Sequence, residues 1–266
     1  MHPRSLSLLI SITFAAASAL ATTVKTDPSA AEIEKIIRTF ADNEAAFAKA
    51  RENYTYRQTV SLQEFDDAGV PHGKFNRVED IIFDRDNKRT ERVVRAPMPT
   101  LRLIQMSAED EQDLRNVMPF VLTSKEIDSY HVRYIGRQMA DEISCYVFAV
   151  KPKTMEPGRR YFQGQIWVDD RDLMIVKTYG RSAGILKKSD NPQQFAKFET
   201  YREQIDGKYW FPTYTSANST LHFTGQEVRV KMTVKYEDYK QFKSDVKITF
   251  GDEAKPEDLK PDKPKQ

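Results

Sequence analysis

The apolar positions near the start of the chain recur at the spacing of an α-helix. They fall at Ile33, Ile36, Ile37, Phe40 and Phe47, and charged residues occupy the positions between them. Asp27 can cap such a helix, and Pro28 suits its first turn. We therefore expect a helix from Asp27 to about Ala50, with its apolar stripe packed against another element.

From Tyr54 onward the apolar positions alternate with polar ones, which is the period of a half-buried strand. Strands are predicted at residues 54–62, 77–83, 90–95, 131–139, 143–151, 160–168, 173–179, 195–205, 208–214 and 228–236, and residues 242–250 close the ordered part. Asp206 and Gly207 are a strong hairpin signal. A second helix is predicted at Ser107–Val121, with acidic residues in its first turn and Pro119 near its end.

Consecutive hairpins of this kind predict a mainly β fold: a single, strongly curved antiparallel sheet. The two predicted helices would lie inside its curve, which gives an incomplete β-barrel with a helical lid. An apolar inner face of this shape can line a cavity for lipid or acyl chains. The candidate cavity-lining residues are Ile33, Ile37, Phe40, Tyr56, Val60, Ile82, Val147, Trp167, Ile175, Val230 and Val234. The same residues can instead pack a dry core, because alternation marks an inner face and not an empty one.

The composition excludes several classes of protein. The 266 residues include 41 Lys+Arg and 39 Asp+Glu, a net charge of +2 without a concentrated basic stripe, so nucleic acid is not an expected partner. Aromatic residues make up 11% of the chain, which is enough apolar bulk to exclude disorder throughout. Cys145 is the only cysteine, so an intrachain disulfide is excluded, and its apolar neighbours predict a buried thiol.

The two ends of the chain differ from its middle. Arg4, the apolar stretch from Leu6 and the Ala19–Ala21 segment together resemble a secretory signal peptide, which predicts cleavage before Thr22. We expect a signal peptide at 1–21, a single domain at 22–250, and a disordered charged tail at 251–266. The predicted location is the periplasm, after export across the inner membrane.

Catalytic and metal-binding motifs are not found in the sequence. His72, His131 and His222 lie far apart, and the spacing of Asp169, Asp170 and Asp172 does not fit a calcium loop. The better interpretation of these carboxylates is solvated turn residues. We therefore expect no enzyme, no metal and no cofactor.

One hairpin resembles a known family. The run from Gly164 to Lys177 contains Gly164-Gln165-Ile166-Trp167-Val168-Asp169, a polar turn, and then Leu173-Met174-Ile175-Val176-Lys177. This run is similar to a hairpin of the LolA/LolB-like lipoprotein-carrier superfamily, which includes outer-membrane lipoprotein-sorting proteins. The order of the predicted elements over residues 29–250 resembles that family as well. The resemblance implies a curved sheet that holds helices as a lid over an apolar cavity.

The first functional hypothesis is therefore a periplasmic carrier that holds the acyl chains of a lipid or lipoprotein, with outer-membrane or other envelope proteins as further partners. The alternative is a structural or interaction protein of the envelope, with a filled β core and no cargo. A hydrolase is a third and weaker hypothesis. An open cavity would favour the carrier, and a packed interior would favour the interaction protein.

Overall fold

The computed structural model describes residues 27–83, 89–106, 120–157, 159, 161–183, 197–223 and 225–241. These residues form one α-helix, two short 3-10 turns (η1, Arg51–Asn53, and η2, Ile127–Ser129) and ten strands. The helix is α1 (Ala30–Ala50). The strands are β1 (Tyr54–Phe65), β2 (Pro71–Phe83), β3 (Arg89–Arg95), β4 (Tyr130–Ala140), β5 (Ile143–Pro152), β6 (Tyr161–Asp169), β7 (Ile175–Ala183), β8 (Lys197–Gln204), β9 (Trp210–Phe223) and β10 (Gln226–Gln241).

Helix α1 begins with a capping box. The Ser29 hydroxyl accepts a hydrogen bond from the backbone N–H of Glu32, and the Glu32 carboxylate accepts one from the backbone N–H of Ser29. The N-cap is therefore Ser29 and not Asp27, because a serine followed three residues later by glutamate satisfies two exposed N–H groups at once. The predicted end of the helix, near Ala50, is confirmed.

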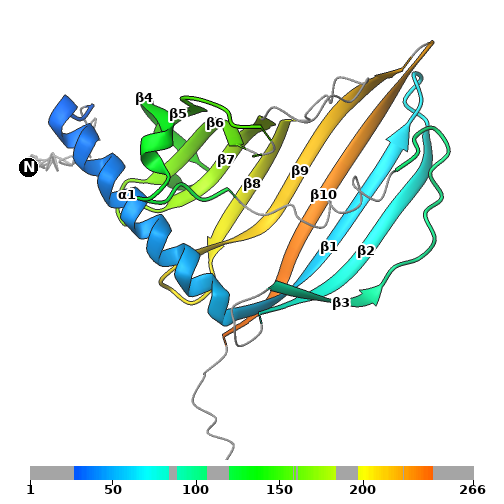
Figure 1. Ribbon diagram of the computed structural model, residues 1–266, viewed down its shortest axis with the longest axis horizontal. Coiled ribbons are helices and arrows are strands. Elements are labelled where there is room, and N and C mark those ends of the chain that lie inside the picture. The colour runs from blue at the N-terminus through cyan, green and yellow to red at the C-terminus, as the bar shows by residue number, and fades with distance from the viewer. Residues whose placement is uncertain are drawn as a thin grey trace, which may run out of the picture.

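All ten strands belong to one antiparallel sheet in the order β3-β2-β1-β10-β9-β8-β7-β6-β5-β4. The sheet is curved and unclosed, with β3 at one edge and β4 at the other (Figure 1). The predicted mainly β class and curved antiparallel sheet are thus confirmed. The strands extend beyond the predicted ranges most clearly at β9, which continues to Phe223, and β10, which continues to Gln241.

The pairing registers assign each residue to a face. Directly paired residues share a face, and one such row crosses nine strands. The row consists of Tyr134, Phe148, Ile166, Thr178, Thr200, Thr215, Val234, Val60 and Arg77. We call this the inner face, because α1 packs on it: the rings of Phe40 and Phe148 lie 5.4 Å apart.

Two different elements cover the inner face. Helix α1 crosses the part built by β4–β9, and Ile36, Phe40 and Ala41 are buried there against Phe148 and Ile166. Residues 96–106, which follow β3 and contain no regular secondary structure, pack over β1, β2 and β10. We call residues 96–106 the cover segment. The predicted helical lid is therefore present over one half of the sheet, and an extended stretch of chain covers the other half.

Some expectations fall outside the described residues. These are the signal peptide at 1–21, most of the second helix predicted at Ser107–Val121, the closing strand at 242–250 and the tail at 251–266. Of that second helix the structure describes Phe120 and Val121, and neither is helical.

Candidate functional site

The cover segment is attached to the sheet through a buried carboxylate. Glu64 on β1 is fully buried and accepts four backbone hydrogen bonds, from the N–H groups of Gly73 at 2.9 Å, Arg102 at 2.6 Å, Leu103 at 3.0 Å and Ile104 at 3.1 Å. Hydrogen bonds to an ionised acceptor are stronger than neutral ones. One side chain therefore satisfies three consecutive amides of a segment that has no regular secondary structure of its own.

Two opposing effects act on the ionisation of Glu64. Burial raises the pKa of its carboxyl group, and the four backbone N–H donors lower it by a larger amount, so the net pKa lies below the usual 4.5. Glu64 is therefore an anion at neutral pH, which is the form that accepts all four hydrogen bonds.

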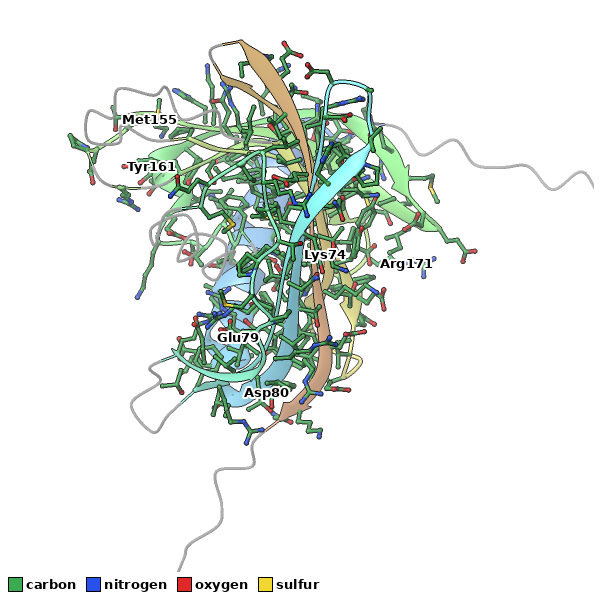
Figure 2. All side chains as sticks on the ribbon, turned by 90° about the vertical axis from the view of Figure 1, so that its right-hand side faces the viewer. Lys74, Glu79, Asp80, Met155, Tyr161 and Arg171 are labelled. Atoms are coloured by element: carbon green, nitrogen blue, oxygen red, sulfur yellow. The ribbon has the colours of Figure 1, made fainter. Side chains whose placement is uncertain are left out.

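The cover segment also approaches the backbone of β2 closely. The backbone N–H of Thr100 donates to the Lys74 carbonyl at 3.0 Å, and the Thr100 hydroxyl accepts from the Lys74 N–H, also at 3.0 Å. At Gly73, a Cβ atom would lie 2.0 Å from the Thr100 carbonyl oxygen. Only glycine permits this contact. Figure 2 shows this side of the molecule, with Lys74 above Glu79 and Asp80 on β2.

Apolar side chains meet beneath the cover segment. The sheet supplies a buried cluster, and the cover segment contributes three partly buried side chains to it. The buried members are Val60, Leu62, Phe75, Val234 and Tyr236, and the cover residues are Leu101, Ile104 and Met106. Three apolar residues, held by a polar anchor beside them, thus occupy the apolar wall of β1, β2 and β10.

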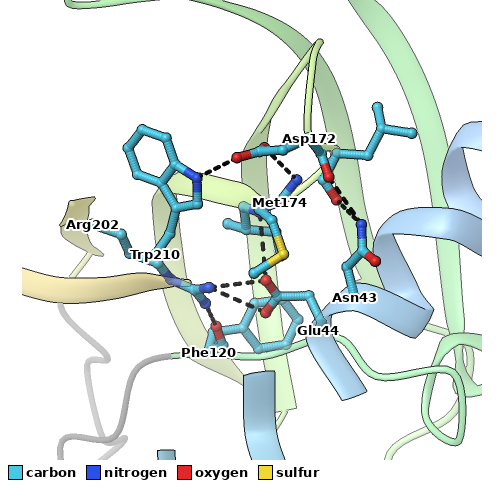
Figure 3. A network of polar contacts seen from close by, with 9 residues as sticks. Asn43, Glu44, Phe120, Asp172, Met174, Arg202 and Trp210 are labelled. Atoms are coloured by element: carbon cyan, nitrogen blue, oxygen red, sulfur yellow. Dashed lines mark hydrogen bonds and ion pairs between the residues drawn. The ribbon is translucent and has the colours of Figure 1, made fainter. Parts of the chain in front are cut away.

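Helix α1 is fixed by a separate polar network (Figure 3). The guanidinium of Arg202 on β8 donates to both carboxylate oxygens of Glu44 at 2.9 and 3.2 Å and also to the carbonyl of Phe120. Both side chains of this ion pair are fully buried. Burial raises the pKa of Glu44, against the attraction of Arg202. Asn43, one residue earlier, donates to the carbonyls of Asp172 and Leu173.

A small pocket lies where α1 ends, at the margin of the apolar wall. Its free volume is about 30 Å³. Aromatic rings and two arginines line it, and the full set is Phe47, Arg51, Tyr56, Phe83, Arg89, Phe211, Pro212 and Tyr239. Tyr56 and Tyr239 stack with centroids 5.2 Å apart and also pack against the cluster under the cover segment. The pocket and the covered apolar wall therefore share Tyr56 and Tyr239.

The structure divides the candidate cavity residues into four groups. Tyr56, Val60 and Val234 come together under the cover segment. Ile33, Ile37 and Phe40 of α1 come together with Ile175 of β7 where the helix packs on the sheet. Val230 shares the inner face and lines an open groove of about 480 Å³ beside the turn at Gly69. Val147, Trp167 and Ile82 point to the opposite, outer face, because each is adjacent in sequence to an inner-face residue.

The outer face has a small core of its own near β4–β7. Val147, Trp167 and Cys145 are buried there, and Trp210 packs against them. The predicted burial of Cys145 is confirmed, and burial, followed by the charge of Asp169, raises the pKa of its thiol to about 12.

The turn acids beside this small core are not solvated as expected. Asp169 is buried, and the Asp170 carboxylate accepts from Arg137 at 2.9 Å and from Ser144 at 2.8 Å. The Asp172 carboxylate accepts from the indole N–H of Trp210 at 2.7 Å. These side chains tie the β6–β7 turn to neighbouring elements, so the expectation of solvated turn residues was wrong.

Sequence reasoning missed Glu64 and the cover segment. Glu64 continues the alternation of β1, but it was not expected on the apolar face, since a carboxylate interrupts the pattern. Residues 96–106 contain two prolines, Pro97 and Pro99, and have no periodicity. The available signal was a glutamate at an inner-face position, which requires buried donors.

Within the described residues, no helix is both long and apolar enough to cross a membrane, and no cluster of three or more His, Cys, Asp or Glu residues is arranged to hold a metal ion. The absence of enzymatic activity, metal and cofactor stays a prediction.

Comparison with known proteins gives a likeness of fold. No family model and no curated protein match the chain. Among solved structures, a DUF1329 family protein from Desulfovibrio piger matches with 12% identity and a TM-score of 0.40, over 80% of this chain and 95% of that one. A LolA superfamily protein from Nitrosomonas europaea matches with 12% identity and a TM-score of 0.31, over 76% and 94%. MucB matches with 13% identity and a TM-score of 0.29, over 79% and 94%.

These three structures share the LolA-like fold. The Gly164–Lys177 hairpin resembles a hairpin of the superfamily that gives this fold its name. At this level of identity the likeness concerns the fold alone.

Proposed function

We propose that the protein binds the acyl chain of a lipid or lipoprotein on the inner face of β1, β2 and β10, and that the cover segment moves aside to admit it. One observation carries the proposal. The apolar wall is covered by three side chains of an irregular segment that is held by the Glu64 carboxylate and by the backbone contacts of Thr100 with Lys74.

The energetics of exchange support this function. A fully packed core has no vacant volume, so an acyl chain can bind only if protein side chains move out of the space that it will occupy. Leu101, Ile104 and Met106 are partly buried and can move together with their segment, whereas α1 is fixed by the buried Glu44–Arg202 pair. Each CH₂ group of a ligand that replaces them regains about 0.8 kcal/mol of burial. Local opening costs less than global unfolding when the moving segment has few buried contacts.

Methionine methyl groups offer a direct test of the binding position. Met106 and Met232 pack against the covered cluster, while Met139 and Met155 are exposed. In protein labelled with ¹³C at its methionine methyls, titration with oleyl alcohol should shift the Met106 and Met232 signals and leave those of Met139 and Met155 in place. Equal shifts at all four, or none, would count against the proposed position.

The setting of this function is part of the proposal. A carrier of acyl chains between membranes would be exported by the signal peptide at 1–21 and would act in the periplasm as a single domain at 22–250, without catalysis. Outer-membrane or other envelope proteins would load or unload it. N-terminal sequencing of the protein from envelope fractions tests the cleavage before Thr22.

A second candidate function is an envelope interaction protein without cargo, and the edge strand β3 favours it. Val93 and Val94 are adjacent and lie on opposite faces of the strand, yet 50% and 47% of their surfaces are exposed. An edge strand with exposed valines can pair with an extended segment of a partner. Val94→Lys should then abolish capture of an envelope partner while leaving the circular dichroism of the protein unchanged.

A further inference from the structure

Three arginines lie near the end of α1, and two of them have a carboxylate partner. Arg202 pairs with Glu44 at 2.9 Å, and Arg89 pairs with Glu91. Arg51, the C-cap residue of α1, differs from them. Within the part of the chain that the structure describes, its guanidinium forms neither a hydrogen bond nor an ion pair.

The surroundings of Arg51 make an unpaired cation unfavourable. The residue is half-buried and forms part of the wall of the 30 Å³ pocket, among the rings of Phe47, Tyr56 and Tyr239. Burial lowers the pKa of Arg51, and repulsion by Arg202 lowers it further. A desolvated charge without a partner costs free energy, so a bound anion would relieve the strain at this position.

We propose that Arg51 receives the carboxylate of a single-chain fatty acid whose tail lies on the covered apolar wall. This inference rests on the proposed function, because the tail occupies the site described there. Tyr56 and Tyr239 line the pocket and also contact the covered cluster, so the head group and the tail would occupy one continuous site.

The charge and size of the pocket select this class of ligand. Arg202 and Arg89 each have a carboxylate partner, whereas Glu44 and Glu52 attract Arg51 without contacting its guanidinium, so a monoanion can pair with it directly. The free volume of about 30 Å³ has room for a few water-sized groups, since one water molecule needs about 10–15 Å³ on this scale. A carboxylate fits this space, and its two oxygens match the two parallel N–H donors of a guanidinium. The head group of a two-chain phospholipid is much larger.

Oleate and oleyl alcohol separate the head group from the tail, because they share the same chain and differ in the carboxylate. Their affinities are measured by calorimetry for the wild-type protein and for the Arg51→Met, Arg51→Lys and Arg38→Met variants. Arg38 is an exposed residue of α1 paired with Glu34, and it serves as the matched control. Charge-assisted hydrogen bonds are worth a factor of about ten or more in affinity.

The wild-type protein should bind oleate about tenfold or more tightly than oleyl alcohol. Arg51→Met should remove this preference while keeping the affinity for the alcohol, Arg51→Lys should retain part of it, and Arg38→Met should behave as the wild type. Oleate labelled with ¹³C at its carboxyl group gives an independent readout. When bound to the wild-type protein, its carboxyl group should remain ionised at a lower pH than in water.

Three results would overturn the inference. Equal affinities of the wild-type protein for the two ligands would show that the head group is not recognised. Equal loss of both ligands in Arg51→Met, with the fold retained by circular dichroism, would show that Arg51 only supports the structure. A bound carboxyl group that titrates as in water would exclude its contact with Arg51. If neither ligand binds the wild-type protein, the proposed function itself fails.

Discussion

Replacing Glu64 by glutamine tests how the cover segment is held. In the wild-type protein one carboxylate oxygen accepts from Gly73 and Arg102, and the other accepts from Leu103 and Ile104. A glutamine side chain has the same shape, but one of the two oxygens becomes an NH₂ group. In either orientation, two backbone N–H groups then face a donor in place of an acceptor.

The size of the effect follows from this count. A hydrogen bond to a charged group contributes about 1.5–3 kcal/mol, and at least one of the two lost bonds belongs to the cover segment, so its closed position is destabilised by at least about 1.5–3 kcal/mol. Amide exchange at Arg102, Leu103 and Ile104 should therefore accelerate about tenfold or more, since 1.36 kcal/mol corresponds to a factor of ten. The amides of α1 should keep their protection. Glu203→Gln, an exposed glutamate bonded to Thr213, is the control.

Acid should reproduce the effect of this substitution. The folded pKa of Glu64 is lower than its unfolded value, so its stabilising contribution is complete above pH 4.5 and is lost as the pH falls below 4.5 through the folded pKa. Exchange at the three cover amides should become faster relative to α1 in that range in the wild-type protein and not in Glu64→Gln. Unchanged exchange of those amides in the variant, or equal acceleration throughout α1, would refute a local anchoring role.

Four further predictions follow from the packing. Arg202→Met leaves the buried carboxylate of α1 unpaired and should lower the free energy of unfolding by about 3–5 kcal/mol in urea denaturation, whereas Arg38→Ala should change it by less than about 1 kcal/mol. Phe40→Ala should cost about 3–5 kcal/mol in the same assay, and an unchanged midpoint would mean that α1 is not docked. Gly73→Ala should displace Thr100 and raise the affinity for oleyl alcohol; a lower or equal affinity contradicts a movable cover. Cys145, with its pKa near 12, should resist alkylation at pH 8 until the protein is unfolded.

The sheet could be predicted from the sequence because alternation is a local signal. Each strand carries its own inner and outer positions, and turns such as Asp206–Gly207 join neighbours that are consecutive in the chain. The exception is the pairing of β1 with β10, which brings Val60 opposite Val234. No local pattern specifies that contact, since it depends on how far the whole sheet curves.

The candidate site was less predictable for a related reason. Alternation identifies which residues share a face within one strand, but it does not fix the phase between strands that lie far apart. Val147 and Trp167 were therefore grouped with Val60, although the registers place them on the other face. The surroundings of Glu64 and Arg51 are built by residues distant in the chain, and such contacts are not visible as periodicity.

The central claim is that the covered inner face holds an acyl chain, and native mass spectrometry tests it most directly. The full chain is purified from cell envelopes without detergent, and its mass is measured under native and denaturing conditions. The protein is then extracted with organic solvent, refolded and incubated with oleyl alcohol. The account predicts a bound acyl species that is released on denaturation, and renewed uptake after extraction. A native mass without any bound ligand before extraction, together with no binding of oleyl alcohol after it, would contradict the account.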